Sequence, residues 1–279
     1  MQVVHFDDVS QFCAVTKDYL LQDEAHHNLI LGLTGLLIQQ PERFTELPYL
    51  ALVEAQGQIL AVALRTPPNK LVVSRALNAE ALSLIAQDLL KRFVQLPAVH
   101  GPNQEAQTFA SAWQSLTGQI PEQGERLRIY QLDQVQPITK VPGYLRCATE
   151  ADRDLLLNWC KTLFEVLNEP ISPQIKQLVD RGLKNQSIWL WQNEVPVSMA
   201  SKGFTTPNGA TINLVYTPPE HRRQGYASSC VAALSQFLLD SGRRHCFLFA
   251  DLANPTSNHI YQTIGYQPVC DVIDYWFQR

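Results

Sequence analysis

The sequence predicts a mixed α/β fold of two tandem domains, each a twisted mixed sheet flanked by helices. The chain has 279 residues, of which 46% are hydrophobic, and this is enough to bury two cores. Both halves run through the same order of elements, three β-rich segments followed by alternating helical and β-rich segments. Between them, residues 134–143 contain prolines and little periodicity, so we predict domains at residues 1–138 and 139–279.

The elements of the first domain follow from β-favouring runs bounded by turn residues and from helical spacing of apolar residues. They are strands at 48–53, 59–64, 70–74 and 127–132, and helices at 28–33, 79–93 and 103–117. The pair His26 and His27 precedes the first of these helices without a cysteine or an acidic partner at metal-ligand spacing. A structural or pocket-lining pair is therefore favoured over a metal site.

The second domain repeats this order. Its predicted elements are strands at 144–148, 187–191, 196–200, 214–216 and 246–252, and helices at 150–167, 226–238 and 255–264. Thr149 is a good N-cap for the first helix, with Asp152 as its partner three residues on. Asn254 and Pro255 suit the start of the last helix, and Gly265 suits its left-handed end.

The strand that ends at Tyr216 leads into a helix start with the character of an anion cradle. Pro218 ends the strand because proline cannot donate to a sheet ladder. Free backbone N–H groups and the helix dipole favour a phosphate at such a helix start. Arg222 and Arg223 would be unfavourable beside this dipole unless an anion compensated them, which indicates that the anion is a ligand.

The loop has neither of the best-known phosphate-binding patterns, Gly-Lys-Ser/Thr or Gly-x-Gly-x-x-Gly. Its pattern, Arg222-x-x-Gly225-x-Ala227, resembles the acetyl-CoA pyrophosphate loop of the GCN5-related N-acetyltransferase (GNAT) superfamily. Downstream, the order Asn254, Asn258, Tyr261 and Gly265-Tyr266 resembles the second acetyl-CoA motif of that superfamily. The resemblance covers about residues 144–279, and the chain most resembles predicted bacterial acetyltransferases with two tandem domains.

The resemblance implies acetyl-CoA as co-substrate and no metal, and it implies site residues in the second domain. The implied cofactor-binding residues are Val215, Tyr216, Thr217, Arg222, Arg223, Gln224, Gly225, Tyr226, Ala227, Ser228, Asn254 and Asn258. Tyr261 would act as the general acid that protonates the leaving thiolate. The segment 75–78 of the first domain has no glycine, so that domain looks like a degenerate copy that does not bind acetyl-CoA.

The implied reaction is the transfer of an acetyl group from acetyl-CoA to a primary amine by direct attack in a ternary complex. A backbone N–H near Val215 would meet the oxyanion. The general base stays open among Glu165, Glu169, Asp251, His245 and water. The acceptor, a small amine, an amino acid or a peptide amine, would bind near residues 164–172 and pieces of the first half, and the length of the acyl chain stays open. The alternative function is a weakly active or inactive CoA-binding or protein-interaction module, and a homodimer is compatible with either.

Composition excludes other classes of function. A net charge of −4 and a pI of about 6.0 give no electrostatic footprint for nucleic acid. The sequence has no signal-like leader and no apolar run long enough for a membrane span, so we expect a cytoplasmic protein without membrane contact. The six cysteines lack Cys-x-x-Cys spacing, and we expect them to be reduced and buried.

Overall fold

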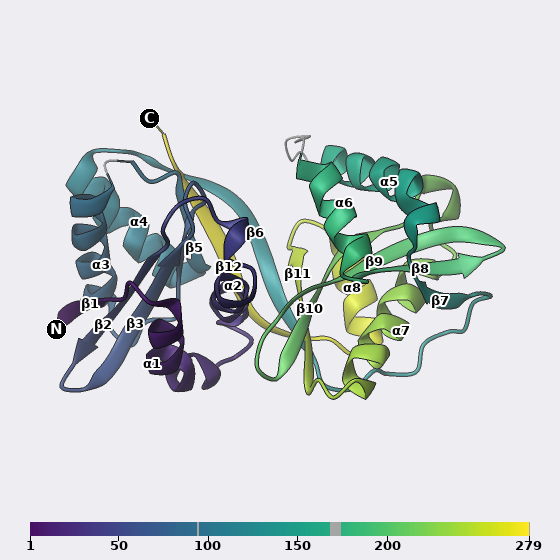
Figure 1. Cartoon of the computed structure of the whole chain (residues 1–279), viewed down its shortest axis with the longest axis horizontal. Helices are drawn as coiled ribbons and strands as arrows, with labels where there is room; N and C mark the ends of the chain where they lie inside the picture. Colours follow the sequence, from purple (N-terminus) through teal and green to yellow (C-terminus); the bar gives the residue numbers. More distant parts are fainter. Residues whose placement is uncertain (94, 168–173, 279) are drawn as a thin grey trace.

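The computed structural model describes residues 1–93, 95–167 and 174–278. One continuous sheet of twelve strands passes through both halves of the molecule, in the order β1-β2-β3-β4-β5-β12-β6-β11-β10-β9-β8-β7. Figure 1 shows the two halves side by side, joined where the long strands β6 and β12 cross between them.

The first half contains every element that the sequence predicts there. Four further elements of this half, β1, α1, η1 and β5, were not predicted. The complete order is β1 (Gln2–His5), α1 (Val9–Leu21), α2 (Asn28–Gln39), η1 (Pro41–Arg43), β2 (Tyr49–Ala55), β3 (Gln58–Arg65), β4 (Leu71–Val73), α3 (Ala79–Arg92), β5 (Ala98–Pro102), α4 (Asn103–Thr117) and β6 (Pro121–Leu132).

The second half repeats this order, as predicted, and helix α6, which the sequence does not predict, takes the place that α2 has in the first half. Its elements are β7 (Tyr144–Cys147), η2 (Glu150–Asp152), α5 (Arg153–Val166), α6 (Gln174–Lys184), β8 (Ile188–Asn193), β9 (Val195–Thr205), β10 (Gly209–Tyr216), η3 (Pro219–His221), α7 (Tyr226–Asp240), β11 (His245–Asp251), α8 (Pro255–Ile264) and β12 (Gln267–Phe277). The predicted capping box is present, because the Thr149 hydroxyl and backbone N–H both reach the Asp152 carboxylate.

Strands β6 and β12 each pair with strands of both halves. The C-terminal strand β12 pairs with β5 of the first half, while β6 of the first half pairs with β11 of the second. A buried ion pair anchors β12 in the first half, where Asp274 accepts from His100 and Lys70. The sequence does not predict this exchange. The domain division at residue 138 stays a prediction, and residues 133–143 form no helix or strand.

The helices cover the sheet on two faces. Arg128 of β6 and Asp271 of β12 form an ion pair at 2.6 Å, so they point to the same face. Side chains alternate along a strand, so Tyr130 and Ile273 point to this face as well. Tyr130 packs with α7 and α8, and Ile273 packs with α3 and α4. We call this the α7 face, and the opposite face, covered by α1, α2, α5 and α6, the α5 face.

The halves also touch through the turn between α1 and α2. The Glu24 carboxylate accepts from the backbone N–H and the side-chain amide of Asn208, at 2.9 and 2.8 Å. Gly32 of α2 lies so close to the Phe204 ring that a Cβ there would be 2.0 Å from it. The first half therefore packs directly on the β9–β10 hairpin of the second.

The six cysteines are free, as expected, but only Cys160, Cys230 and Cys246 are buried, and the other three are half-buried. No helix in the described ranges is both long and apolar enough to cross a membrane. Within those same ranges, no group of histidine, cysteine and acidic residues could hold a metal ion.

Candidate functional site

The predicted anion cradle forms where β10 passes into α7. Two residues have positive φ, Arg223 at 61° and Gly225 at 82°. Glycine adopts this conformation readily, whereas arginine does so at a cost, and such backbone concavities bind anions elsewhere. Arg222 donates from Nε to the Thr217 carbonyl at 3.0 Å, and the Gln224 amide donates to the Glu220 carbonyl at 3.2 Å. The loop is thus fixed by its own contacts before any ligand binds.

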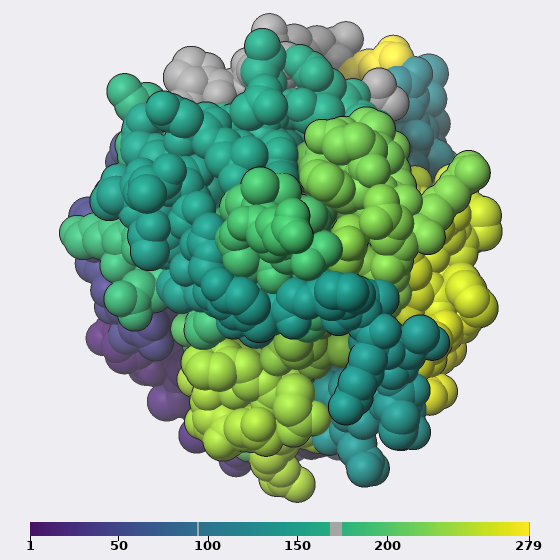
Figure 2. All heavy atoms as spheres, turned by 90° about the vertical axis from the view of Figure 1, so that its right-hand side faces the viewer, coloured from purple at the N-terminus to yellow at the C-terminus, as the bar shows by residue number. Residues whose placement is uncertain are grey.

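The start of α7 has free hydrogen-bond donors. Gly225 is its N-cap, no side chain caps it, and its first turn contains no acidic residue. The backbone N–H groups of residues 226–228 have no acceptor in the helix, as at any helix start, and none is found for them elsewhere in the described chain. Arg222 and Arg223 are exposed, and neither forms an ion pair with a described residue. The light green segment after β10 lies on the outer surface in Figure 2.

Tyr226, Ala227 and Ser228 continue the cradle into the helix. The Tyr226 side chain turns inward, where its hydroxyl accepts from the Asn193 amide at 2.9 Å and fixes the helix start on β8. Ala227 and Ser228 are half-buried. The backbone of Tyr226, rather than its ring, is therefore placed to meet a ligand.

A wedge opens between β10 and β11. Their parallel pairing covers three residue pairs, the last being Thr211 with Phe247, although both strands continue. Leu214 has a φ of 48° and forms a bulge, so Leu214 and Val215 have no register partner on β9 or β11. The predicted strand is present, and the role of the Val215 backbone toward a cofactor stays a prediction.

Beyond the bulge, Tyr216 and Thr217 are held from inside. Tyr216 is buried, and its ring packs on Trp159 of α5. Ser198 donates to the Tyr216 carbonyl at 3.1 Å and lies 2.9 Å from the Thr217 hydroxyl. These contacts define the C-terminal end of β10 and hence one side of the wedge.

The α8 asparagines build the turn from β11 into the helix. The Asn254 side chain accepts from the Ser257 N–H at 3.1 Å as the N-cap. The Asn258 amide donates to the Asp251 and Asn254 carbonyls, and its oxygen accepts from the Tyr130 hydroxyl at 2.8 Å. Both side chains are therefore occupied by structural contacts, which leaves their direct role toward a cofactor a prediction.

Tyr261 lies on the same helix and packs against the α7 face of the sheet. Its ring is 8% exposed and packs between Tyr130 and Tyr266. Its hydroxyl makes no hydrogen bond with the described residues. Burial raises its pKa to about 12, so the phenol is protonated at neutral pH and able to donate.

The candidate bases lie apart. Asp251 is at the C-terminal end of β11, where its carboxylate accepts from the Ala253 N–H at 2.8 Å. His245 is at the other end of the same strand, about 20 Å away, and pairs with Asp133. Glu165 is exposed in the last turn of α5, and Glu169 lies outside the described residues. Asp251 ends β11, on the part of that strand that no longer pairs with β10.

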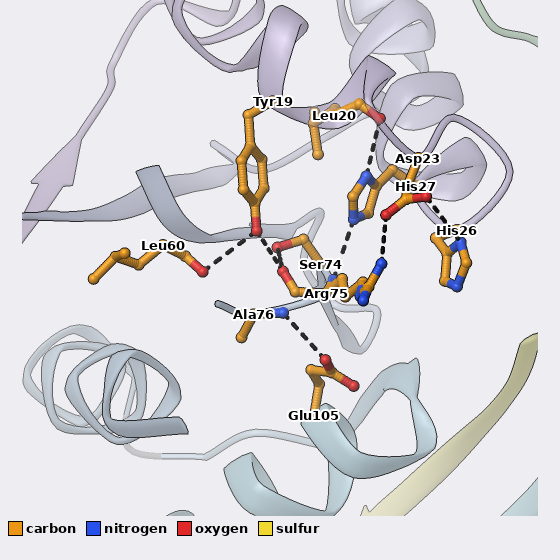
Figure 3. Close-up of polar contacts among 10 residues, drawn as sticks. All are labelled: Tyr19, Leu20, Asp23, His26, His27, Leu60, Ser74, Arg75, Ala76 and Glu105. Carbon is orange, nitrogen blue, oxygen red and sulfur yellow. Dashed lines mark hydrogen bonds and ion pairs between the residues drawn. The ribbon is translucent and has the colours of Figure 1, made fainter. Parts of the chain in front are cut away.

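The corresponding place in the first half is closed by side chains (Figure 3). After β4, the Arg75 N–H donates to His27 Nε2 at 3.2 Å, and the Arg75 carbonyl accepts from the Tyr19 hydroxyl at 2.5 Å. The Ala76 N–H donates to Glu105 at 3.2 Å. His27 also bonds the Leu20 carbonyl, so it is structural, as expected. No cradle of the α7 type forms here.

Three features that shape the candidate site were not predicted from the sequence. Ser198 and the Leu214 bulge have no local signature, since the bulge contains no glycine. Tyr130 reaches Asn258 from β6 of the first half, and local pattern cannot predict a contact between residues 128 positions apart.

The family model for FR47-like proteins matches residues 192–276, which include the cradle, the wedge and α8. The whole chain is similar to a GNAT-family acetyltransferase from Colwellia psychrerythraea, with 10% identity, 100% coverage of both chains and a TM-score of 0.62. It is also similar to a GCN5-related N-acetyltransferase from Sphaerobacter thermophilus, with 13% identity, 98% and 94% coverage and a TM-score of 0.63.

A tandem GNAT protein from the clavulanic acid biosynthesis pathway shares 12% identity over 98% and 97% of the chains, with a TM-score of 0.55. The search of curated proteins found no match. The predicted family resemblance and the tandem fold are thereby confirmed.

Proposed function

Since this is a tandem GNAT-fold protein with an FR47-like second half, we propose that it transfers an acetyl group from acetyl-CoA to a primary amine. The observation that carries the proposal is the uncapped start of α7 beside the open wedge. The helix N–H groups and the two arginines without ion-pair partners would bind a pyrophosphate. The strand backbone at Val215, which has no register partner, would bind an amide-bearing arm.

In this proposal the protein contributes binding and orientation more than covalent chemistry. Free N–H groups at the start of α7 hold the phosphates, and the backbone at Val215 holds the thioester arm and the developing oxyanion. Tyr261 donates from its unoccupied hydroxyl to the departing thiolate. Its pKa of about 12 keeps that proton available throughout the neutral range. Asp251 or water takes the proton that the amine loses.

The test uses a matched pair of variants in the first turn of α7. Ala227→Glu adds a negative charge where a helix favours one, so the fold is kept while a phosphate is repelled. Ala227→Gln has nearly the same size without the charge. We expect calorimetry to give acetyl-CoA binding for the wild type and Ala227→Gln but not for Ala227→Glu, and amine-dependent thiol release to follow the same pattern.

Binding without thiol release for any amine would favour the alternative, a CoA-binding or protein-interaction module. If the wild type does not bind acetyl-CoA, or if Ala227→Glu binds it as tightly, the proposed cofactor site is wrong.

A further inference from the structure

Three buried tyrosines form a cluster on the α7 face. The ring centroids of Tyr130 of β6 and of Tyr266, which follows α8, lie 6.3 and 6.1 Å from that of Tyr261. The Tyr130 hydroxyl donates to Asn258 at 2.8 Å, and the Tyr266 hydroxyl lies 2.8 Å from the Ser235 hydroxyl. Among the described residues, the Tyr261 hydroxyl has no such partner. Two hydroxyls of the cluster are therefore held by hydrogen bonds, and the third is free to donate.

The bond from Tyr130 reaches both residues that the proposed function uses to transfer protons. Asn258 lies three residues before Tyr261 and on the same side of α8. The Asn258 amide donates to the Asp251 carbonyl at 2.8 Å and to the Asn254 carbonyl at 2.7 Å. Asp251 is the last residue of β11 and a candidate for the general base. Asn258 thus fixes the helix of the proposed acid against the strand end with the candidate base.

Tyr130 fixes the orientation of Asn258. The nitrogen of an asparagine amide donates and its oxygen accepts, and the donor to the Asn258 oxygen in the described part of the chain is Tyr130. Without that donor, the oxygen would lose its partner and the amide could rotate away from the two carbonyls. The Tyr130 side chain is itself rigidly placed, because it is fully buried and its strand pairs with β11 and β12 on both sides.

Tyr130 lies on β6, a strand that precedes the second half in the sequence. The first half forms no cradle of the α7 type, but through β6 it places a hydroxyl beneath the helix that contains Tyr261. The pairing of β6 with β11 therefore gives the first half a direct contact with the candidate site.

We propose that Tyr130 is a positioning residue for the acetyl transfer, because through Asn258 it holds Tyr261 where the phenol can protonate the leaving thiolate. This inference rests on the proposed function. In the reaction, the amine nitrogen bonds to the thioester carbon, the C–S bond breaks, and Tyr261 gives its proton to the thiolate. The proton lost by the amine, taken up by Asp251 or water, restores the phenol, so protons balance over one turnover.

The experiment is a double-mutant cycle on kcat, measured as thiol release from acetyl-CoA. The acceptor is hydroxylamine, which is small and uncharged at neutral pH. Tyr130→Phe keeps the ring and removes the hydroxyl, so kcat should fall by about tenfold while the KM for acetyl-CoA stays unchanged, since a slightly misplaced catalytic group costs about this much or more. In a Tyr261→Phe background, Tyr130→Phe should change kcat by less than about twofold, because no acid is left to position.

Tyr49→Phe is the matched control. Tyr49 is a buried tyrosine on β2 of the first half, and its hydroxyl donates to the Asp88 carboxylate at 3.0 Å. Tyr49→Phe and Tyr130→Phe each remove one phenol hydrogen bond, so both should lower the melting temperature by a few degrees. Only Tyr130→Phe should lower kcat. A purely structural role for Tyr130 would make the two variants alike in both measurements.

Nuclear magnetic resonance of isotope-labelled tyrosine rings follows the same contact without turnover. The Tyr261 signal, identified by its loss in Tyr261→Phe, should shift in Tyr130→Phe and stay in place in Tyr49→Phe. An unchanged Tyr261 signal in Tyr130→Phe, or losses of kcat that multiply in the double variant, would overturn the inference.

The cycle also separates this inference from the proposed function. If Tyr261→Phe lowers kcat and Tyr130→Phe does not, the inference fails and the proposed function survives. If Tyr261→Phe leaves kcat unchanged, or if the wild type releases no thiol, the acid role of Tyr261 fails and this inference fails with it.

Discussion

Helices α3 and α7 occupy equivalent places in the two halves, and their starts are built in opposite ways. The Asn78 side chain caps α3 by accepting from the Glu80 N–H at 2.8 Å, and Glu80 adds a negative charge to its first turn. Helix α7 starts at Gly225, without a side-chain cap or an acidic residue, and follows two arginines. The protein itself satisfies the dipole and the free N–H groups of α3, whereas those of α7 are left for an anion.

The strands before these helices differ in the same sense. After β4, side chains from α1, α4 and the turn before α2 occupy the backbone groups of Arg75 and Ala76. At the Leu214 bulge of β10, no described side chain bonds the backbone of Leu214 or Val215, and neither residue has a register partner. In the same fold, the backbone after the strand can therefore be bonded by side chains, as after β4, or lack side-chain partners, as at the β10 bulge. The difference lies in a few polar contacts. This agrees with the prediction that the first half is a degenerate copy.

The largest expected effect is on kcat, and it tests the role of Tyr261 in the second half. Tyr261→Phe removes a proton donor, and general acid catalysis contributes about 10²-fold or more, so kcat should fall by about 100-fold. The affinity for acetyl-CoA should change little. The melting temperature should also stay within a degree or two, because the hydroxyl makes no hydrogen bond with the described residues. Steady-state kinetics, calorimetry and thermal unfolding measure the three quantities.

A core tyrosine without a catalytic role would leave kcat unchanged. Equal losses of kcat and acetyl-CoA affinity would instead assign Tyr261 to binding. Either result would contradict its role as general acid.

A smaller effect separates the two helix starts. Gly225→Ala puts a Cβ 2.9 Å from Val141 at a φ of 82°, which costs about 1–2 kcal/mol and distorts the cradle, so acetyl-CoA affinity should fall by about tenfold. Asn78→Ala removes the cap of α3 and should cost about 1 kcal/mol of unfolding free energy without changing acetyl-CoA affinity. A change in acetyl-CoA affinity for Asn78→Ala would show that the start of α3 takes part in binding the cofactor.

The smallest effect is on the free energy of unfolding, and it compares the N-terminal ends of α5 and α1. Arg146 donates to both Asp152 oxygens, at 2.7 and 2.8 Å, and these bonds lower the pKa of Asp152 to about 2. The unfolded carboxyl has a pKa of about 3.9, so the stabilisation is complete above that value and is lost as pH falls toward 2. Asp152→Asn should therefore cost about 1–2 kcal/mol at pH 7 and progressively less below pH 4.

Asp8, which caps α1 from an exposed position, is the control for that comparison. Asparagine caps a helix about as well as aspartate does, so Asp8→Asn should change the unfolding free energy by less than about 0.5 kcal/mol. Denaturant unfolding at several pH values distinguishes the two variants. If the loss of unfolding free energy in Asp152→Asn does not depend on pH, the loss comes from packing and not from the ion pair with Arg146.

Local chemistry made much of the second half predictable. Pro218 and Gly225 mark the end of a strand and the start of a helix whatever surrounds them, and Asn254 and Gly265 cap α8 as their positions predict. The cradle and the family resemblance could be inferred because they depend on consecutive residues.

The remaining features depend on contacts between distant segments. The exchange of β6 and β12 pairs strands more than a hundred residues apart, and hydrophobic alternation does not specify the partner. The polar closure of the first half combines Tyr19, His27 and Glu105, whose spacing in sequence follows no motif. The contact between the halves depends on the packing of α2 on β9, which the sequence does not indicate.

The number of acetyl-CoA molecules that one chain binds tests the central comparison most directly. Calorimetry of the wild-type protein should give one site per chain, and the same titration of Ala227→Glu should give none. Two sites in the wild type would place a cofactor in the first half, and one site that persists in Ala227→Glu would show that the start of α7 is not the cofactor site. Either result would contradict the account.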